Sequence, residues 1–162
     1  MKNQAVAIDL QEPLQVQVKV KDALNQEVMV NGTVFGLVQI SPNSNVNPLV
    51  NQGINFSANT GKAPYVFSMV SGLGTISSSG SFTAGVSAGA VQIKVVDTLN
   101  QQNTFSFTVH PEISINTSNC ANIPETQSCT ISATGGFGSR TFAVDKGVVN
   151  ASSGLYTGSC VN

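Results

Sequence analysis

The chain carries an internal repeat with a period of 75 residues. The segment IKVVDTLNQQ, residues 93–102, nearly copies VKVKDALNQE, residues 18–27, and Asp97 follows Asp22 by 75 positions. The offset persists through the whole segment, as expected of a duplicated structural unit rather than a chance match. The repeat therefore predicts that equivalent positions of the two copies have the same local structure.

The repeated segment reads as a β-hairpin. Residues 14–20, LQVQVKV, alternate strictly between apolar and polar side chains, and this period of two is typical of a half-buried strand. Residues 90–96 repeat the alternation, and residues 103–109 follow with a second strand pattern after the turn DTLNQQ. The apolar face of the first copy consists of Leu14, Val16, Val18 and Val20.

A second pair of similar segments lies outside the hairpin. Residues 56–69, FSANTGKAPYVFSM, align with residues 131–144, ISATGGFGSRTFAV, and residues 78–85 align with 152–159 after a slip of one position. No segment shows a helical period, whereas short strand patterns alternate with Gly, Asn and Ser turns. This arrangement predicts an all-β sandwich. Its buried face is expected to include Phe67, Phe82, Ile93, Val95, Phe105, Phe107 and Val109.

The chain resembles the bacterial immunoglobulin-like repeat modules of surface proteins, adhesins and fibres. The resemblance rests on residues 58–85, ANTGKAPYVFSMVSGLGTISSSGSFTAG, and residues 93–109, IKVVDTLNQQNTFSFTV, together with their partial copies. It implies tandem immunoglobulin-like β-sandwich modules at the bacterial cell surface or outside the cell. The chain has no Trp, so the Cys-Trp-Cys core of antibody domains is absent.

The repeat divides the chain into one complete module and two partial ones. Residues 42–111 hold every expected strand, residues 1–41 hold only a closing hairpin, and residues 112–162 hold only opening strands. Either the segment is a window in a longer repeat protein, or the hairpin of one subunit completes the open module of the next. In the second case the chain assembles head to tail, because a half-sandwich exposes unpaired backbone groups that an incoming strand satisfies.

The composition argues against several classes of partner. Seven basic residues are scattered among eight acidic ones, with a net charge of −1, so neither nucleic acid nor an anionic membrane is an expected partner. No apolar run approaches the roughly 18 residues of a membrane span. The opening MKNQAVAIDL is too short in apolar length for a secretory signal, and we expect such a signal outside the segment.

The sequence offers little chemistry for an enzyme or a cofactor. His110 is the one histidine and precedes Pro111 at an expected strand end, where a solvent-facing boundary residue is the simpler interpretation. Asp22 and Asp97 recur in the hairpin turn, and each turn lacks the clustered oxygens that Ca²⁺ prefers. We therefore expect both aspartates to cap turns, and we expect neither catalysis nor a bound cofactor.

The cysteines lie in the last third of the chain. Cys120 and Cys129 flank the loop ANIPETQS, whose Pro124 favours a turn that brings the two thiols together. In a surface protein this pair is expected to form a disulfide. Cys160 then remains unpaired or bonds another chain, and the competing pair of Cys129 with Cys160 stays open.

Two functions follow from these patterns. The first is a structural repeat or subunit of a bacterial surface fibre or adhesin stalk, with neighbouring copies or repeats as partners. The second is a ligand-binding module, in which end loops such as GKAP at residues 61–64 grip a carbohydrate or protein on the host or another surface. Tyr65 and Tyr156, the only tyrosines, lie in strand-like contexts, and this argues against sugar stacking.

Overall fold

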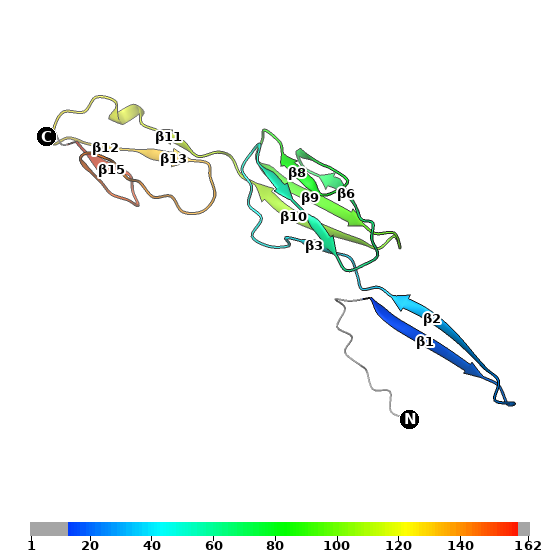
Figure 1. Ribbon diagram of the computed structural model, residues 1–162. Helices are drawn as coiled ribbons and strands as arrows, with labels where there is room; N and C mark the ends of the chain where they lie inside the picture. Colours follow the sequence, from blue (N-terminus) through cyan, green and yellow to red (C-terminus); the bar gives the residue numbers. More distant parts are fainter. Residues whose placement is uncertain (1–12, 159–162) are drawn as a thin grey trace.

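The computed structural model describes residues 13–158 and shows three β units that follow one another along an extended chain (Figure 1). The first unit is a hairpin of β1 (Leu14–Lys21) and β2 (Glu27–Val34). The second is a central sandwich, and the third is a smaller β unit on its far side. The hairpin and the third unit therefore lie at opposite ends of the central sandwich (Figure 1).

The central sandwich is built from short antiparallel strands. One sheet has the order β10-β9-β6, a second has the order β4-β8-β7, and β3 pairs with β5. Its strands are β3 (Gln39–Ser41), β4 (Gly53–Asn55), β5 (Ser57–Asn59), β6 (Val66–Ser71), β7 (Gly74–Ile76), β8 (Ser81–Ala84), β9 (Gly89–Val96) and β10 (Gln102–Val109).

The core of the molecule lies inside this central sandwich. Of the side chains predicted to be buried, all are buried except Phe105, which is partly buried and packs against the others. The core also includes Val38 and Ile40, which precede the boundary expected at residue 42. These two residues enter the core because β3 pairs with β5, so the chain joins the sandwich directly after the hairpin.

The third unit repeats the strands of the first half of the central sandwich. It contains β11 (Ser114–Asn116), the 3₁₀ helix η1 (Ser118–Cys120), β12 (Ser128–Thr130), β13 (Ser132–Thr134), β14 (Val148–Val149) and β15 (Leu155–Thr157). β11 pairs with β13, and β12, β15 and β14 form a small sheet. No helix within residues 13–158 has the length and apolar character needed to cross a membrane.

Candidate self-association site

The β1–β2 hairpin has one wholly apolar face, and that face is open to solvent. In the antiparallel ladder Val18 lies opposite Val30 and Val20 lies opposite Val28, so these side chains share one face. Val18 is 59% exposed and Val20 is 65% exposed. An isolated two-stranded hairpin is at best marginally stable in water, so a face of this kind is expected to acquire a partner layer.

The other face of the hairpin is polar except for Met29, and its polar side chains bond to one another across the strands. The Gln17 side chain donates a hydrogen bond to Asn31 Oδ1 at 3.0 Å, and Lys19 Nζ lies 2.6 Å from Glu27 Oε1. Cross-strand pairs of this type are the contacts that stabilise a sheet surface facing water. The two faces therefore differ as the inner and outer faces of a sandwich sheet differ.

The β1–β2 hairpin has a counterpart in the central sandwich, the β9–β10 hairpin. Strands β1 and β2 have the bounds of β9 and β10 shifted by 75 positions, and both hairpins pair in the same register. In β9 the apolar side chains face the core, and Ile93 and Val95 have no exposed surface. The corresponding positions of β1 are Val16, Val18 and Val20, which match Val91, Ile93 and Val95. Leu14 matches Gly89, an exposed position at the end of β9.

Both hairpin turns are capped by an aspartate, as the sequence predicts. Asp97 Oδ1 accepts hydrogen bonds from the backbone N–H groups of Leu99 and Gln101, each at 2.9 Å. Asp22 Oδ1 accepts the equivalent bonds from Leu24 and Gln26 at 2.9 and 2.8 Å. These bonds confirm the turn-capping prediction. Within the part of the chain that the structure describes, no three His, Cys, Asp or Glu side chains gather into a metal-binding group.

Asp97 differs from Asp22 because it is buried and has one further partner. Asp97 Oδ2 accepts a hydrogen bond from the backbone N–H of Lys62 at 2.9 Å, which links the hairpin turn to the loop between β5 and β6. Burial raises the pKa of Asp97, but hydrogen bonds from three backbone N–H groups and the charge of Lys62 outweigh it. They hold the pKa below its ordinary value of 3.8.

The third unit lacks the hairpin within the described residues. Strands β11, β12 and β13 have the bounds of β3, β4 and β5 shifted by 75 positions. The Ile131 N–H donates to Gly154 O at 2.9 Å, just as the Phe56 N–H donates to Gly80 O at 2.8 Å. Residues 141–146, the counterpart of β6, form no strand. The reason is that β6 pairs with β9, and the third unit has no counterpart of β9 within residues 112–158.

A cavity marks the open side of the third unit. It has a volume of about 320 Å³, and Ile131, Ala133 and Phe142 are among its lining residues. The alignment of residues 56–69 with residues 131–144 gives each of these three side chains a counterpart in the central sandwich. Their counterparts Phe56, Ala58 and Phe67 belong to the core cluster of the central sandwich or pack against it. Within residues 13–158, the apolar face of the β1–β2 hairpin is therefore uncovered, and the third unit has no counterpart of the β9–β10 hairpin.

A disulfide closes the loop at the far end of the third unit. Cys120 and Cys129 are bonded, with their Cα atoms 5.5 Å apart, and the bond links η1 to β12. Cys129 is the buried apolar residue of this unit. Cys160 lies outside the described residues, so its pairing stays a prediction.

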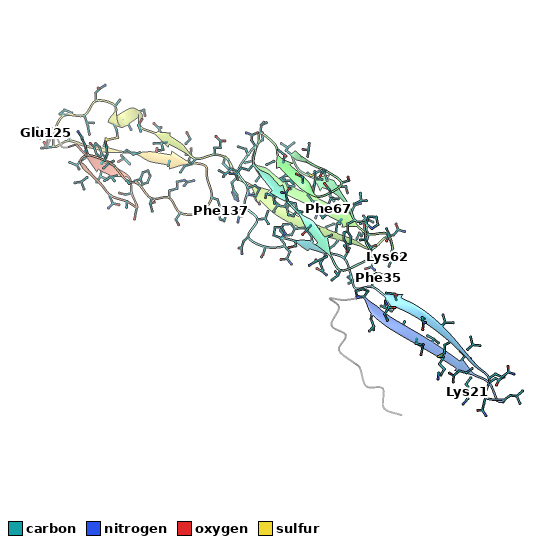
Figure 2. The ribbon with its side chains drawn as sticks, in the orientation of Figure 1. Lys21, Phe35, Lys62, Phe67, Glu125 and Phe137 are labelled. Atoms are coloured by element: carbon teal, nitrogen blue, oxygen red, sulfur yellow. A yellow bond between two sulfur atoms is a disulfide. The ribbon has the colours of Figure 1, made fainter. Side chains whose placement is uncertain are left out.

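The two connections between units use equivalent positions. Where the hairpin meets the central sandwich, Lys62 Nζ lies 5.7 Å from the centre of the Phe35 ring (Figure 2). Where the central sandwich meets the third unit, the rings of His110 and Phe137 are 4.7 Å apart. His110 follows Phe35 by 75 positions, and Phe137 follows Lys62 by the same number. Sequence reasoning missed this joint because its residue types differ between the two copies. The offset of 75 positions relates one contact to the other.

His110 is packed into this joint rather than exposed at a boundary. Its backbone N–H donates to Pro48 O at 2.8 Å, and its carbonyl accepts from the Val50 N–H at 2.9 Å. Its Nε2 atom is buried and has no hydrogen-bond partner among the described residues. His110 is partly buried, because its main chain pairs with Pro48 and Val50 and its ring lies against that of Phe137, so the expectation of a solvent-facing histidine is wrong.

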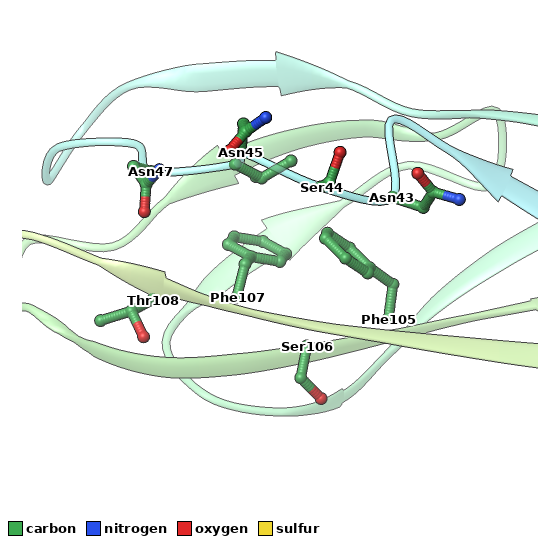
Figure 3. Close-up of a pocket in the computed structure, with 9 residues that line it drawn as sticks. Asn43, Ser44, Asn45, Asn47, Phe105, Ser106, Phe107 and Thr108 are labelled. Atoms are coloured by element: carbon green, nitrogen blue, oxygen red, sulfur yellow. The ribbon is translucent and has the colours of Figure 1, made fainter.

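The loop proposed for ligand binding takes part in internal contacts. Thr98 donates its hydroxyl to the carbonyl oxygen of Lys62 at 2.9 Å, and the Tyr65 hydroxyl donates to Thr60 O at 2.7 Å. A groove of about 430 Å³ lies elsewhere, between residues 43–47 and strand β10. Phe105 and Phe107 point toward residues 43–47, whereas Ser106 and Thr108 point away (Figure 3).

Comparison with known proteins places the fold. Neither a protein-family model nor a curated protein matches the chain. The C-terminal 282-residue fragment of intimin, solved in complex with the intimin-binding domain of the translocated intimin receptor, matches with a TM-score of 0.52 and 19% identity. The match covers 67% of this chain and 44% of the fragment, so the chain spans less than half of the fragment's length. A mutant intimin of EHEC O157:H7 matches with a TM-score of 0.42 and 18% identity, covering 58% of this chain and 62% of that one.

The likeness to the intimin fragment concerns the fold. The chain is an all-β protein with an immunoglobulin-like sandwich, and this confirms the fold class predicted from the sequence. At this level of identity the function rests on the chain's own residues.

Proposed function

We propose that the protein is a non-enzymatic structural segment of a bacterial surface fibre or adhesin stalk, located outside the cell, whose copies assemble head to tail. Its parts are a closing hairpin within residues 1–41, a module in residues 42–111 that β3 (Gln39–Ser41) completes, and an open module in residues 112–162. The sandwich fold that the chain shares with an intimin fragment is consistent with this location. The observation that carries the proposal is the match between the β1–β2 hairpin and the β9–β10 hairpin, which has no counterpart in residues 112–158.

The central sandwich supplies the register of the proposed junction. There β6 pairs with β9, with Phe67 opposite Val95 and Met69 opposite Ile93. Shifted by the repeat, this ladder places Phe142 of one copy opposite Val20 of the next, and Val144 opposite Val18. Residues 141–146 would then gain the strand partner that they lack, which is the general mode of β-strand addition to an open sheet edge.

Burial of the hairpin face favours this junction. Val18 and Val20 would change from more than half exposed to the fully buried state of Ile93 and Val95. Full burial contributes about 1.5 kcal/mol for a valine, and association costs about 4 to 15 kcal/mol. Val16, Val18, Val20 and Val34 match the buried Val91, Ile93, Val95 and Val109, whereas Val28 and Val30 match the partly buried Asn103 and Phe105. Burial of this face therefore supplies a stabilisation of the same order as the lower part of that cost. The backbone hydrogen bonds of a new ladder add to it.

The positions of the β1–β2 hairpin and the third unit favour assembly between copies. The hairpin and the third unit lie at opposite ends of the central sandwich, so one copy does not close on itself in this conformation (Figure 1). A contact between two different surfaces of the same chain need not close into a ring, and so it grows open filaments. The complementing residues predicted from the sequence, Leu14, Val16, Val18 and Val20, would lie at each junction, with Leu14 at its rim.

A pair of complementary variants tests this proposal. Val18→Asp places a charge on the apolar face of the hairpin but leaves the third unit able to accept a hairpin. Val144→Asp places a charge on residues 141–146, which would accept the hairpin, but leaves the hairpin itself intact. Val144 is 38% exposed and Val18 is 59% exposed, so neither change buries a charge in the separate chain. Inside a junction Val18→Asp would place an unpaired carboxylate at the fully buried position of Ile93, and Val144→Asp would place one at the partly buried position of Met69. Each change is expected to weaken association, and Val18→Asp by at least roughly 100-fold.

The wild-type chain should form filaments in electron micrographs, and each variant alone should be monomeric by analytical ultracentrifugation. An equimolar mixture of the two should form a dimer of one copy each, because it restores one junction. Gln15→Asp, on the polar face, should still form filaments. A wild-type chain that stays monomeric at high micromolar concentration, or a mixture that does not dimerise, would overturn the proposal.

The groove beside β10 supports a second candidate function, a ligand-binding module. The rings of Phe105 and Phe107 stack at 5.8 Å with an interplanar angle of 24°, beneath the amide and hydroxyl side chains of residues 43–47. Aromatic floors with nearby amides are typical of sites for carbohydrate or peptide ligands. The intimin fragment was solved bound to a receptor domain, which is consistent with binding by a related fold. Binding on a glycan or peptide array that Phe105→Ala abolishes would support this candidate.

A further inference from the structure

Asp97 shows how a closing hairpin is held in its sandwich. One carboxylate oxygen caps the hairpin's own turn, and the other accepts a hydrogen bond from the Lys62 N–H, in the loop between β5 and β6, at 2.9 Å. The backbone of Gly61 lies so close to the carboxylate that a Cβ atom on it would be 2.8 Å from Asp97 Oδ2. The contact therefore needs both an acceptor in the turn and a glycine beside the donor.

The β1–β2 hairpin has the same turn, but its aspartate lacks the hydrogen bond that Asp97 accepts from the Lys62 loop. Its backbone follows that of the later copy, with φ of 63° at Asn25 and 61° at Asn100. Asp22 Oδ1 caps this turn as Asp97 Oδ1 does. Its other oxygen, Oδ2, accepts no hydrogen bond from any residue among 13–158.

The loop of the third unit offers the matching donor. Gly136 has a φ of 69°, close to the 65° of Gly61, so the same open approach is present there. Phe137 occupies the position of Lys62 in the repeat. Its backbone N–H makes no hydrogen bond to another residue in the described part of the chain.

We propose that Asp22 anchors the junction between copies by accepting, through Oδ2, the backbone N–H of Phe137 in a second copy of this chain. The inference rests on the proposed head-to-tail assembly and names the residue that fixes its register. A slip of one residue would turn every valine outward. A slip of two residues would still place valines inward, because Val16, Val18 and Val20 are alike. The turn carboxylate, which meets the Phe137 N–H only in the correct register, distinguishes it from that alternative.

Asp22→Asn is the sharpest test because it leaves the hairpin itself intact. The amide oxygen of asparagine still caps the Leu24 and Gln26 N–H groups, while its Nδ2 presents a donor where Phe137 requires an acceptor. The change is made in the Val144→Asp chain, which donates its hairpin to the Val18→Asp chain in a defined dimer. Glu27→Gln in the same chain removes an equal charge from the polar face and is the matched control.

Binding between the two chains should weaken by roughly tenfold or more with Asp22→Asn, which is the loss of one hydrogen bond to a charged acceptor. It should change by less than about twofold with Glu27→Gln. Hydrogen exchange gives the second measurement. The Phe137 amide of the accepting chain should be protected when the donating chain carries Asp22, and it should remain fast at saturation with the Asp22→Asn donor. The Leu24 and Gln26 amides should be unaffected.

Equal affinity and equal Phe137 protection with both donors would overturn the role of Asp22 and leave head-to-tail assembly standing. Failure of the Val18→Asp and Val144→Asp chains to bind at all would overturn the assembly, and this inference with it.

Discussion

Phe107→Ala should destabilise the central sandwich more than any other single truncation in β10. Phe107 is 7% exposed and touches three other rings. Its ring centre lies 5.1 Å from that of Phe82 in an edge-to-face contact, 5.5 Å from Phe56 and 5.8 Å from Phe105. The substitution removes a side chain that joins the β10-β9-β6 sheet to the β4-β8-β7 sheet.

The expected loss follows from burial and ring contacts. Truncation of a buried phenylalanine costs about 3 to 5 kcal/mol, including the cavity it leaves, and each aromatic pair accounts for about 0.5 to 1.5 kcal/mol of that. For a unit of this size each kcal/mol lowers the melting temperature by about 4 to 8 °C. The melting temperature of the central sandwich should therefore fall by at least about 12 °C.

Phe105→Ala is the matched control, because Phe105 lies two positions away on the same face but is only partly buried. Urea unfolding followed by circular dichroism should show a clearly smaller loss for Phe105→Ala than for Phe107→Ala. A loss below about 1 kcal/mol for Phe107→Ala, or equal losses for both, would refute the assignment of Phe107 to the core.

Two further predictions concern Asp97 and the cysteines. The pKa of Asp97 lies below its ordinary 3.8 in the folded chain, so the ionised carboxylate stabilises the fold above about pH 4. This stabilisation is lost as the pH falls through the folded pKa. Asp97→Asn should therefore lower stability at pH 7 and make stability less dependent on pH in acid. An acid limb unchanged by Asp97→Asn would contradict this. Reduction of the bond between Cys120 and Cys129, nine positions apart, should cost the third unit about 2 to 3 kcal/mol and leave the central sandwich unchanged by differential scanning calorimetry. Nonreducing mass mapping should find these two cysteines in one linked peptide, with Cys160 free or joining two chains; a bond from Cys129 to Cys160 would contradict it.

The hairpins could be predicted from the sequence because their structure is local. Strict alternation fixes the faces of β1 and β9, and an aspartate followed by an asparagine three positions later fixes the turn. Both signals lie within about 20 residues, and the repeat shows them twice. The core followed from the same alternation, except that Phe105 is partly exposed because β10 is an edge strand beside an open groove.

Features that depend on distant partners could not be predicted in the same way. Residues 141–146 are the counterpart of β6 in the repeat, yet they form no strand, because strand formation there requires a neighbour equivalent to β9. The contact of Asp97 with the Lys62 N–H joins positions 35 apart and uses a backbone donor that no side-chain pattern reveals. The joint between His110 and Phe137 was hidden because its earlier copy uses Phe35 and Lys62 instead.

These joints separate two properties of the proposed fibre. The contacts that orient one sandwich relative to the next, Phe35 with Lys62 and His110 with Phe137, both lie within a single copy. The proposed junction between copies lies inside a sandwich, where the hairpin face and residues 141–146 meet. Substitutions at the joints should therefore change the bend or twist of a filament without changing the affinity between copies. Substitutions at Val18, Val144 or Asp22 should change that affinity without changing the bend.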